Sequence, residues 1–396
     1  MHKKKEKKLS VLYILDKFPV HSQTFILNEI LAVRRKDINL SIVALRRGNW
    51  KKTHSSARDI RENIHYLCDV KLLRKLYIIS PFIFFNLKSA ISVWKRAYAA
   101  EQWKKGALKC LIDCCYLTVL FSGKIDHIHV HFAKTAADYA YYTHLLSGIP
   151  YTFTSHGYDI YQEPPRNMRE KTENAYRHLT VSNFNREYLI RQMDLPPERV
   201  EVCYLGVDLK KFSFSDHGHK DKIILNIGRL ESVKGHEYLI EACRKLRQEG
   251  VDFKCLIVGD GSRRDELTRL IEERRLDGYV RLVGSKTNEE IVEYYRKSMV
   301  FALPSLSEGL PIVLMEALAC GVPCVASNVN GIPEIIQHEK SGLLVEPGDA
   351  NGLADKTKFL LDDSEMKRKC IQEGLNLVKN RFNIEISANK LISFWN

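Results

Sequence analysis

The sequence predicts an α/β protein with two domains, each built on a parallel β-sheet. The chain has 396 residues, which is long for a single hydrophobic core. Short apolar runs alternate with helical patterns from end to end, and runs such as CLIV and IILNI are continuously apolar. Alternation of this kind is typical of βαβ units, and continuous apolar runs are typical of parallel strands buried on both faces.

The predicted strands are too many for one open twisted sheet, so two sheets are expected. In the first half of the chain the strands cover residues 10–15, 40–45, 125–132, 151–155, 179–182 and 200–204. In the second half they cover residues 223–227, 254–258, 280–283, 300–303, 324–326 and 343–345. The helices between them include residues 24–35, 136–146, 235–249, 264–275, 288–297 and 311–319.

The domain boundary is predicted in the polar stretch 208–221, which contains few long aliphatic residues. We therefore expect an N-terminal domain over residues 1–212 and a C-terminal domain over residues 222–378. Residues 379–396 are expected to form a terminal helix that packs back on the N-terminal domain.

Composition excludes several classes of protein. Hydrophobic residues make up 45% and charged residues 28%, which is a globular balance and not that of a disordered or collagen-like chain. The ten Cys residues contain no C-x-x-C pair and lie mostly in apolar runs, so buried reduced thiols in a cytosolic protein are expected in place of a zinc site. We expect no secretory signal and no transmembrane helix, because the most apolar segment, 76–87, is shorter than the roughly twenty residues of a span.

Positive charge is concentrated in two segments, 2–8 and 71–109, which supply nearly all of the formal net charge of +13. Localised positive charge is typical of proteins that bind nucleic acid or an anionic membrane surface. The second segment mixes Lys and Arg with Leu, Ile, Phe and Trp, as an interfacial amphipathic element does. Two alternatives stay open: a merely solvated basic face, and aromatic residues that pack within the domain.

The clearest candidate site is the segment 304–321, PSLSEGLPIVLMEALACG. Glu308 lies in a loop after a strand, Pro311 opens a helix, and that helix contains Glu316. A helix N-terminus offers free N–H groups and the positive end of a dipole to a phosphate, while the two carboxylates offer acceptors to neighbouring hydroxyls. Phosphate next to hydroxyls describes a nucleotide sugar. Glu316 is alternatively an ordinary helix residue, but its apolar neighbours indicate burial and therefore a partner.

Two cations, Arg229 and Lys234, lie in the next candidate segment, 226–236 (NIGRLESVKGH). At a βα turn on the carboxyl edge of a parallel sheet they are placed to hold a diphosphate, although loop cations are often only solvated. The turn 259–262 (GDGS) has Arg264 where a dinucleotide-binding fingerprint needs Gly, so hydride transfer is not favoured.

Histidines dominate the candidates in the N-terminal half. His127, His129 and His131 alternate on one strand and are expected to face one side, which suggests a metal site. No acidic residue follows at ligand spacing, so ordinary packing is favoured. His156 and Asp159 follow the next strand, where parallel sheets bind ligands, and a structural role for His156 is the alternative.

These motifs together resemble the retaining glycosyltransferases of family 4, which have the GT-B fold of two facing Rossmann-like domains with a cleft between them. In the C-terminal half the resemblance rests on GRLESVKG (228–235), VGDG (258–261), VGS (283–285), E-x7-E (308–316), CGVPCVAS (320–327) and GIPEII…SGLLVEPGD (331–349). In the N-terminal half it rests on HVHFA (129–133), SHGYDI (155–160) and FPVHSQTFI (18–26). The last of these is similar to the subgroup that builds bacterial exopolysaccharide and O-antigen repeat units, the colanic-acid type among them.

The resemblance implies a role for each matching residue. Glu308 would contact the hydroxyls of the transferred sugar, and Glu316 those of the ribose. Arg229 and Lys234 would hold the diphosphate and stabilise the charge of the departing nucleotide, while His156 would approach the sugar from the other domain. The base would bind at 284–286 and the sugar and phosphate at 309–312. The remaining donor-binding residues implied are Gly228, Gly284, Ser285, Lys286, Gly309, Leu310, Pro311 and Ile312.

The first βα turn departs from the family pattern, because it reads DKFPVHSQTF and has no Gly-Gly loop. Ser22 and Thr24 would take over part of that role at the helix start, and with Asp159 they are the acceptor-side candidates. The sequence has no Asp-x-Asp motif, which fits the metal-independent habit of the family, so neither a metal nor a cofactor is expected.

The resemblance implies a UDP- or GDP-sugar donor and transfer with retained configuration, by front-side attack without a covalent nucleophile. The implied acceptor is a hydroxyl of a lipid-linked oligosaccharide at the cytoplasmic face of the plasma membrane. Two alternatives stay open: a GT-B enzyme of another reaction, such as a sugar-nucleotide epimerase, and a non-catalytic basic binding protein. No base-stacking motif favours nucleic acid.

Overall fold

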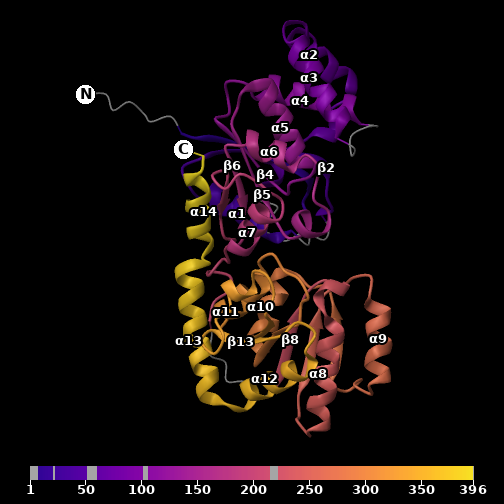
Figure 1. Cartoon of the computed structure of the whole chain (residues 1–396), viewed down its shortest axis with the longest axis vertical. Helices are drawn as coiled ribbons and strands as arrows, with labels where there is room; N and C mark the ends of the chain where they lie inside the picture. Colours follow the sequence, from indigo (N-terminus) through magenta and orange to yellow (C-terminus); the bar gives the residue numbers. More distant parts are fainter. Residues whose placement is uncertain (1–7, 21–22, 51–59, 101–105, 215–221, 396) are drawn as a thin grey trace, which may run out of the picture. The chain divides into compact units, whose positions relative to one another are not determined.

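The computed structural model describes residues 8–20, 23–50, 60–100, 106–214 and 222–395. The chain forms two compact units, Met1–Cys203 with Ala388–Asn396, and Tyr204–Ser387 (Figure 1). The division therefore falls at Cys203, before the predicted boundary at 208–221. The physical reason is that Val207 pairs with Asn383 and Phe212 packs against Tyr295, so these residues belong to the core of the second unit.

The first unit is built on a seven-stranded sheet in which every strand pair is parallel, as predicted. The strand order is β3-β2-β1-β4-β5-β6-β7. The strands are β1 (Ser10–Phe18), β2 (Asn39–Arg47), β3 (Ile64–Tyr66), β4 (His127–His131), β5 (Tyr151–Ser155), β6 (Arg177–Thr180) and β7 (Val200–Val202). The sequence did not predict β3, because a three-residue edge strand leaves too short an apolar run to recognise.

The helices of this unit are α1 (Thr24–Arg34), α2 (Leu72–Phe85), α3 (Leu87–Ala99), α4 (Ala107–Phe121), α5 (Thr135–Ser147), α6 (Met168–Asn174), α7 (Asn183–Arg191) and the end of α14 (Ile384–Ser393). Helices α4 and α5 bury most of their residues, including Tyr139, Tyr141 and Tyr142. A buried ion pair, Lys171 with Asp138 at 2.8 Å, joins α6 to α5. Charged groups this deep need a partner, because an unpaired buried charge is costly.

The second unit contains a six-stranded parallel sheet in the order β10-β9-β8-β11-β12-β13. Its strands are β8 (Ile223–Ile227), β9 (Lys254–Val258), β10 (Val280–Gly284), β11 (Val300–Leu303), β12 (Cys324–Ser327) and β13 (Gly342–Val345). Its helices are α8 (His236–Gln248), α9 (Arg264–Glu273), α10 (Asn288–Lys297), α11 (Ile312–Ala319), α12 (Ala350–Asp362) and α13 (Ser364–Arg381). Helix α8 contacts α9 and α12, and α11 contacts α13.

Both sheets reverse their strand order at one place, between β1 and β4 in the first unit and between β8 and β11 in the second. Ligands of open α/β sheets bind outside the carboxyl ends of the strands at such a reversal. We therefore expect the ligand-binding sites at the carboxyl ends of these four strands.

The end of the chain belongs to the first unit. The indole N–H of Trp395 donates to the hydroxyl of Thr152 on β5 at 3.2 Å, and its ring packs against Tyr13 on β1. The predicted terminal segment 379–396 is divided, however, because the residues before Ala388 belong to the second unit. None of the ten Cys residues, all of which the structure describes, forms a disulfide, and all except Cys68 are buried.

Among the described residues no single helix is long and apolar enough to cross a membrane. Helices α2 and α3, taken together, have the length and composition of a span, but they are bent by 113° at their junction.

Candidate active site

The core of the candidate site in the second unit is a side-chain cluster formed by the loops after β8 and β11. The Nζ of Lys234 lies 2.5 Å from Oε1 of Glu308, and the hydroxyl of Ser305 donates to the same oxygen at 2.8 Å. Both members of the ion pair are largely buried, with exposed side-chain fractions of 18% and 10%. The structure thus brings together two of the four predicted catalytic residues.

Backbone contacts hold these two loops against each other. Gly235 has φ +62°, and a Cβ there would lie 2.2 Å from the carbonyl oxygen of Pro304. The amide N–H of Leu306 donates to the carbonyl of Val233 at 2.8 Å. Glycine is therefore required at 235, both for its left-handed conformation and for the close approach, and this fixes Lys234 beside Glu308.

Arg229 lies exposed at the same sheet edge, directly after Gly228. Its guanidinium has no hydrogen-bond or ion-pair partner in the described part of the chain. A free cation beside a paired one leaves positive charge available for an anionic ligand.

Glu316 is buried inside α11, as its apolar neighbours predict. The Tyr295 hydroxyl donates to its Oε2 at 3.0 Å. Burial raises the pKa of Glu316 to about 7, against the lowering effects of the Tyr295 hydrogen bond and the positive charge of Lys211. This carboxyl group therefore changes its charge near neutral pH.

Tyr295 and Lys211 are residues that the sequence analysis missed. The expectation of a partner for Glu316 was correct, but Tyr295 lies on α10 and nothing in the local sequence links it to α11. Lys211 falls inside the predicted N-terminal domain, whereas the structure assigns it to the second unit. Burial lowers the pKa of Lys211.

Helix α11 begins at Ile312, one residue later than predicted, with Pro311 as the residue that precedes it. No side chain caps this helix N-terminus. The loop before it, which includes Gly309 and Leu310, is anchored by a hydrogen bond from the Asn330 amide to the Ser307 hydroxyl at 3.0 Å. The free N–H groups of the first turn are thus open to an anion.

The turns after β8, β9 and β10 lie backbone against backbone. A Cβ on Gly259 would lie 1.8 Å from the carbonyl oxygen of Gly228, and the amide of Gly259 donates to the carbonyl of Gly284 at 3.1 Å. These glycines therefore allow close approach between turns, beyond the tight turn expected for GDGS. Ser285 is exposed, and Lys286 pairs with Glu290 at 3.3 Å.

In the first unit, His156 follows β5 and is held by the residue predicted as its companion. Asp159 accepts the backbone N–H of His156 at 2.7 Å and that of Ala133 at 2.6 Å. Because Asp159 is fully buried and engaged with backbone, an acceptor-side role does not fit it, and it shapes the turn that carries His156. Burial raises the pKa of Asp159 to about 6. Thr24 begins α1, and Ser22 lies outside the described residues.

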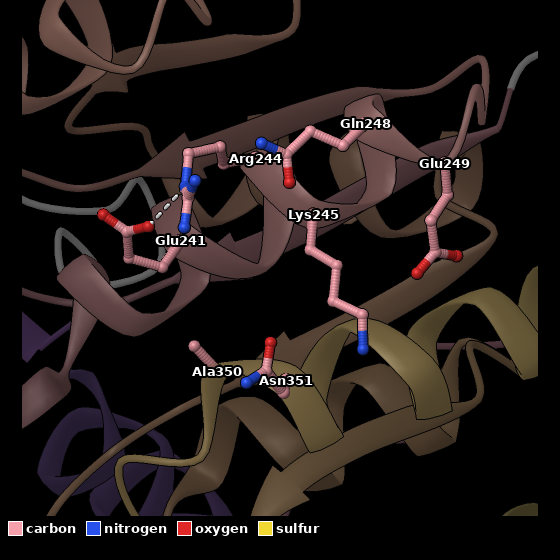
Figure 2. A pocket seen from close by; sticks show the side chains of 7 residues that line it. All are labelled: Glu241, Arg244, Lys245, Gln248, Glu249, Ala350 and Asn351. Carbon is pink, nitrogen blue, oxygen red and sulfur yellow. Dashed lines mark hydrogen bonds and ion pairs between the residues drawn. The ribbon is translucent and has the colours of Figure 1, made fainter.

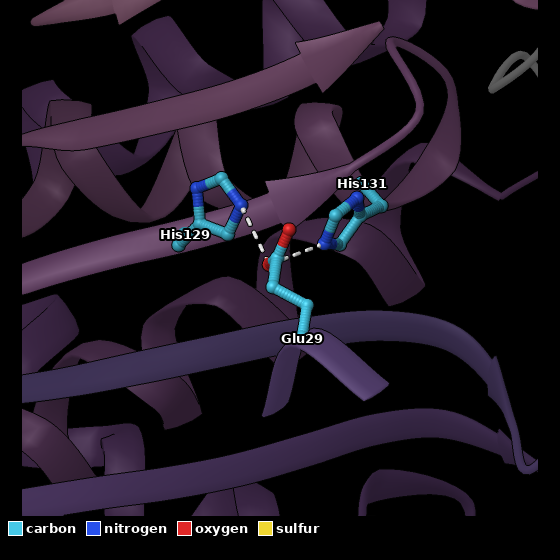
Figure 3. A group of neighbouring side chains, drawn as sticks. All are labelled: Glu29, His129 and His131. Carbon is cyan, nitrogen blue, oxygen red and sulfur yellow. Dashed lines mark hydrogen bonds and ion pairs between the residues drawn. The ribbon is translucent and has the colours of Figure 1, made fainter. Parts of the chain in front are cut away.

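The strand histidines face one side of β4, as predicted, and surround a residue that the sequence analysis did not connect with them. Figure 3 shows His129 and His131 around the carboxylate of Glu29 from α1. Glu29 Oε1 lies 2.9 Å from Nε2 of His131 and 3.7 Å from Nε2 of His129. Three buried groups of this kind have the donor set of a metal site, whereas His127 is bonded to Thr152.

A separate pocket is lined by residues of α8 and of the start of α12 (Figure 2). Its charged groups are engaged with neighbours: Glu241 accepts from Arg244 at 2.7 Å, and Lys245 pairs with Asp355 at 2.6 Å. None of its lining residues belongs to the cluster around Lys234 and Glu308, so it does not take part in the candidate site.

Known proteins match the chain along most of its length. Residues 208–376 match the family model "Glycosyl transferases group 1", and residues 71–211 match "Glycosyltransferase Family 4". The chain is 31% identical to the amylovoran biosynthesis glycosyltransferase AmsK of Erwinia amylovora, over 87% of this chain and 89% of that protein. It is 28% identical to the putative colanic acid biosynthesis glycosyltransferase WcaL of Escherichia coli, over 97% and 99%.

Solved structures agree on the fold. A glycosyltransferase from Rickettsia africae superposes with a TM-score of 0.72 at 19% identity and covers 98% of both chains. Anabaena HepE, in complex with UDP and glucose, superposes with a TM-score of 0.71 at 16% identity over 97% and 98%. On sequence and on fold, the chain belongs to the family 4 glycosyltransferases, with the two Rossmann-like domains of the GT-B fold.

Proposed function

We propose that this glycosyltransferase moves a sugar, with retained anomeric configuration, from a UDP- or GDP-sugar to a hydroxyl of a lipid-linked oligosaccharide in bacterial surface polysaccharide synthesis. The observation that carries the donor part is the Lys234–Glu308 pair at the sheet edge that also carries the exposed Arg229.

The charges of this cluster suit a sugar diphosphate. Arg229 and Lys234 supply two cations for the departing nucleotide diphosphate, whose negative charge grows as the glycosidic bond breaks. Glu308 would accept hydrogen bonds from hydroxyls of the transferred sugar, and the uncapped start of α11 would add backbone N–H donors for the phosphate. With these groups in place, we propose that the leaving diphosphate itself assists deprotonation of the acceptor hydroxyl and that no metal is required.

The nucleoside half of the donor fits the neighbouring groups. Glu316 would accept hydrogen bonds from the ribose hydroxyls, and the Tyr295 hydroxyl would hold the Glu316 carboxylate in position. The base would meet the backbone of the turn at Gly284, Ser285 and Lys286. A pocket built from backbone explains why the side chains alone do not separate UDP from GDP.

The surface of α2 and α3 supports a lipid-linked acceptor. Phe84 and Phe85 at the end of α2 are 80% and 81% exposed, and Trp94 and Tyr98 on α3 are also exposed. Exposed aromatic residues next to Lys and Arg are typical of interfacial helices. We propose that this surface, which lies inside the predicted segment 71–109, docks on the cytoplasmic face of the plasma membrane.

A basic pocket adjoins this surface at the start of α2. Its lining includes Arg47, Arg61, Lys71 and Arg74. Arg47 is paired with Asp69 at 2.6 Å, whereas the described residues give Lys71 and Arg74 no ion-pair partner. One relative's name gives a diphospho-undecaprenol acceptor for a Campylobacter jejuni enzyme, 34% identical over 54% of this chain. We propose that these cations face the diphosphate of a similar acceptor.

Calorimetric titration with UDP, GDP, ADP and their common sugar conjugates tests the donor proposal. We expect saturable binding of one nucleotide class, and at 100 times the dissociation constant a stabilisation of about 2.7 kcal/mol in a thermal-unfolding assay. Glu316→Ala should abolish or weaken this binding. Glu373→Ala, on the exposed side of α13, is the matched control and should bind as the wild type does.

Transfer is then assayed with the bound sugar nucleotide and a polyprenyl-diphosphate oligosaccharide. Product with the anomeric configuration of the donor supports the proposal. Inverted product, epimerised sugar nucleotide, or no nucleotide binding by folded protein would each contradict it.

A further inference from the structure

Four side chains in the first unit form a continuous hydrogen-bonded chain that ends at His156. The Tyr13 hydroxyl donates to Glu29 Oε1 at 2.8 Å, and Nε2 of His131 lies 2.9 Å from the same oxygen. The other ring nitrogen of His131, Nδ1, lies 3.3 Å from Nε2 of His156. All four residues are buried, and they come from β1, α1, β4 and the turn after β5.

The chemistry of these groups determines which atom carries each proton along the hydrogen-bonded chain. A carboxylate only accepts, so Nε2 of His131 must carry a proton and donate it to Glu29. A neutral His131 then has a bare Nδ1 that accepts, so His156 must donate from its own Nε2–H.

We propose that Glu29 and His131 are positioning residues that hold His156 as its Nε2–H tautomer and leave Nδ1 as a hydrogen-bond acceptor. The Nδ1 of His156 would then accept a hydrogen bond from a hydroxyl of the bound sugar and would not donate one to it. This inference rests on the proposed function, because it assigns a task to His156 in sugar transfer.

Packing around His156 reinforces the orientation. Phe25 and Phe132 pack against the His156 ring at centroid distances of 4.8 and 4.7 Å. The Asp159 carboxylate accepts a hydrogen bond from the backbone N–H of His156. Aromatic walls and a fixed backbone restrict the ring, while the bond to His131 selects which nitrogen faces inward. The arrangement follows the general rule that the group bonded to one ring nitrogen of a histidine determines which tautomer the other nitrogen presents.

His129 supplies a matched control on the same strand. It is as deeply buried as His131, its Nδ1 lies 2.8 Å from the Thr152 hydroxyl, and its Nε2 makes no hydrogen bond, lying 3.7 Å from Glu29 Oε1. His129→Phe should therefore disturb the core about as much as His131→Phe, without breaking the hydrogen-bonded chain that leads to His156.

The experiment is a histidine side-chain ¹⁵N correlation spectrum of the full-length protein, recorded for the wild type, His131→Phe and His129→Phe. We expect the Nε2–H tautomer for His156 in the wild type and in His129→Phe, and a mixture of tautomers in His131→Phe. The kcat of His131→Phe should fall by about 10- to 100-fold, with less than about a twofold change in KM for the donor.

Glu29 provides a second test if His131→Phe does not fold. Glu29→Gln retains an acceptor oxygen and should preserve the His156 tautomer, whereas Glu29→Leu should not. An Nδ1–H tautomer of His156 in the wild type, a positively charged His131, or an unchanged spectrum in His131→Phe would overturn the inference. So would one equivalent of bound zinc that Glu29→Gln removes, because the cluster would then be a metal centre.

The spectrum also separates this inference from the proposed function. A protein without transferase activity that shows the expected tautomers would contradict the proposed function alone. An active enzyme whose kcat and tautomers do not respond to His131→Phe would contradict the positioning role alone.

Discussion

At the scale of single residues, the candidate donor site depends on a few charged side chains, each with few hydrogen-bond or ion-pair partners. Lys234 and Glu308 neutralise each other inside the site, the Arg229 side chain makes no hydrogen bond or ion pair with the described residues, and Glu316 depends on Tyr295. Under the proposed function, the donor diphosphate would meet Arg229 and also Lys234, which would exchange part of its contact with Glu308 for the phosphate. The charge that develops during transfer would then act on groups already fixed in place.

Removing either cation should reduce turnover more than donor binding. For Arg229→Ala and Lys234→Ala we expect kcat to fall by about 100-fold or more, because leaving-group charge is greatest in the transition state. Steady-state kinetics with the cognate sugar nucleotide measure this, with Lys358→Ala on α12, whose side chain is 40% exposed, as the control. Wild-type turnover in either site variant would contradict the assignment.

Glu316 should give the protein a pH-dependent stability. Its pKa is raised from 4.5 to about 7 by burial, so the unfolded chain ionises first as the pH rises. The free energy of unfolding should therefore fall by up to about 3 kcal/mol between pH 4.5 and 7, relative to Glu316→Gln. Urea unfolding of both proteins across this range measures the difference, and parallel curves would contradict it.

At the scale of elements, α2 and α3 differ from an ordinary surface helix because they leave large apolar side chains exposed. They contact α4 on one side (Figure 1), yet Leu73, Tyr77, Phe84 and Phe85 each expose more than three quarters of their surface. An apolar surface of this size next to cations is characteristic of an interaction site.

Charge and aromatic residues on these helices should both contribute to membrane binding. We expect Arg74→Glu with Lys88→Glu to weaken binding to phosphatidylglycerol vesicles by at least about 2 kcal/mol, because each cation near an anionic surface contributes about 1 kcal/mol. Phe84→Ser with Phe85→Ser should weaken binding further, and Phe359→Ser on α12 should not. Vesicle co-sedimentation measures this, and no binding by the wild type would exclude the membrane surface.

At the scale of the whole molecule, each domain has its own core, and the chain returns to the first unit at its end. Trp395 completes that unit by covering Tyr13 and Thr152 beside the strand histidines. A residue at the very end of the sequence thus supports the sheet that carries His156.

Loss of Trp395 should destabilise the first unit selectively. We expect Trp395→Ala to cost about 3–5 kcal/mol there, as large-to-small changes in cores do. Hydrogen exchange should accelerate in β4 and β5, while nucleotide binding by the second unit is retained. Because the protein has two units, exchange resolved by segment is the suitable measurement, and uniform acceleration in both units would contradict this prediction.

The sequence by itself determined the fold class, most strand positions and the family. Continuous apolar runs and glycine spacing are local signals, so they predicted β8, β9 and β11 at their observed bounds and placed Arg229, Lys234 and Glu308 at one sheet edge. Only the tertiary structure decided which distant residues meet. Tyr295 beside Glu316, and Glu29 between His131 and Tyr13, are contacts made across elements, and no local pattern records which side chain a buried charge will find.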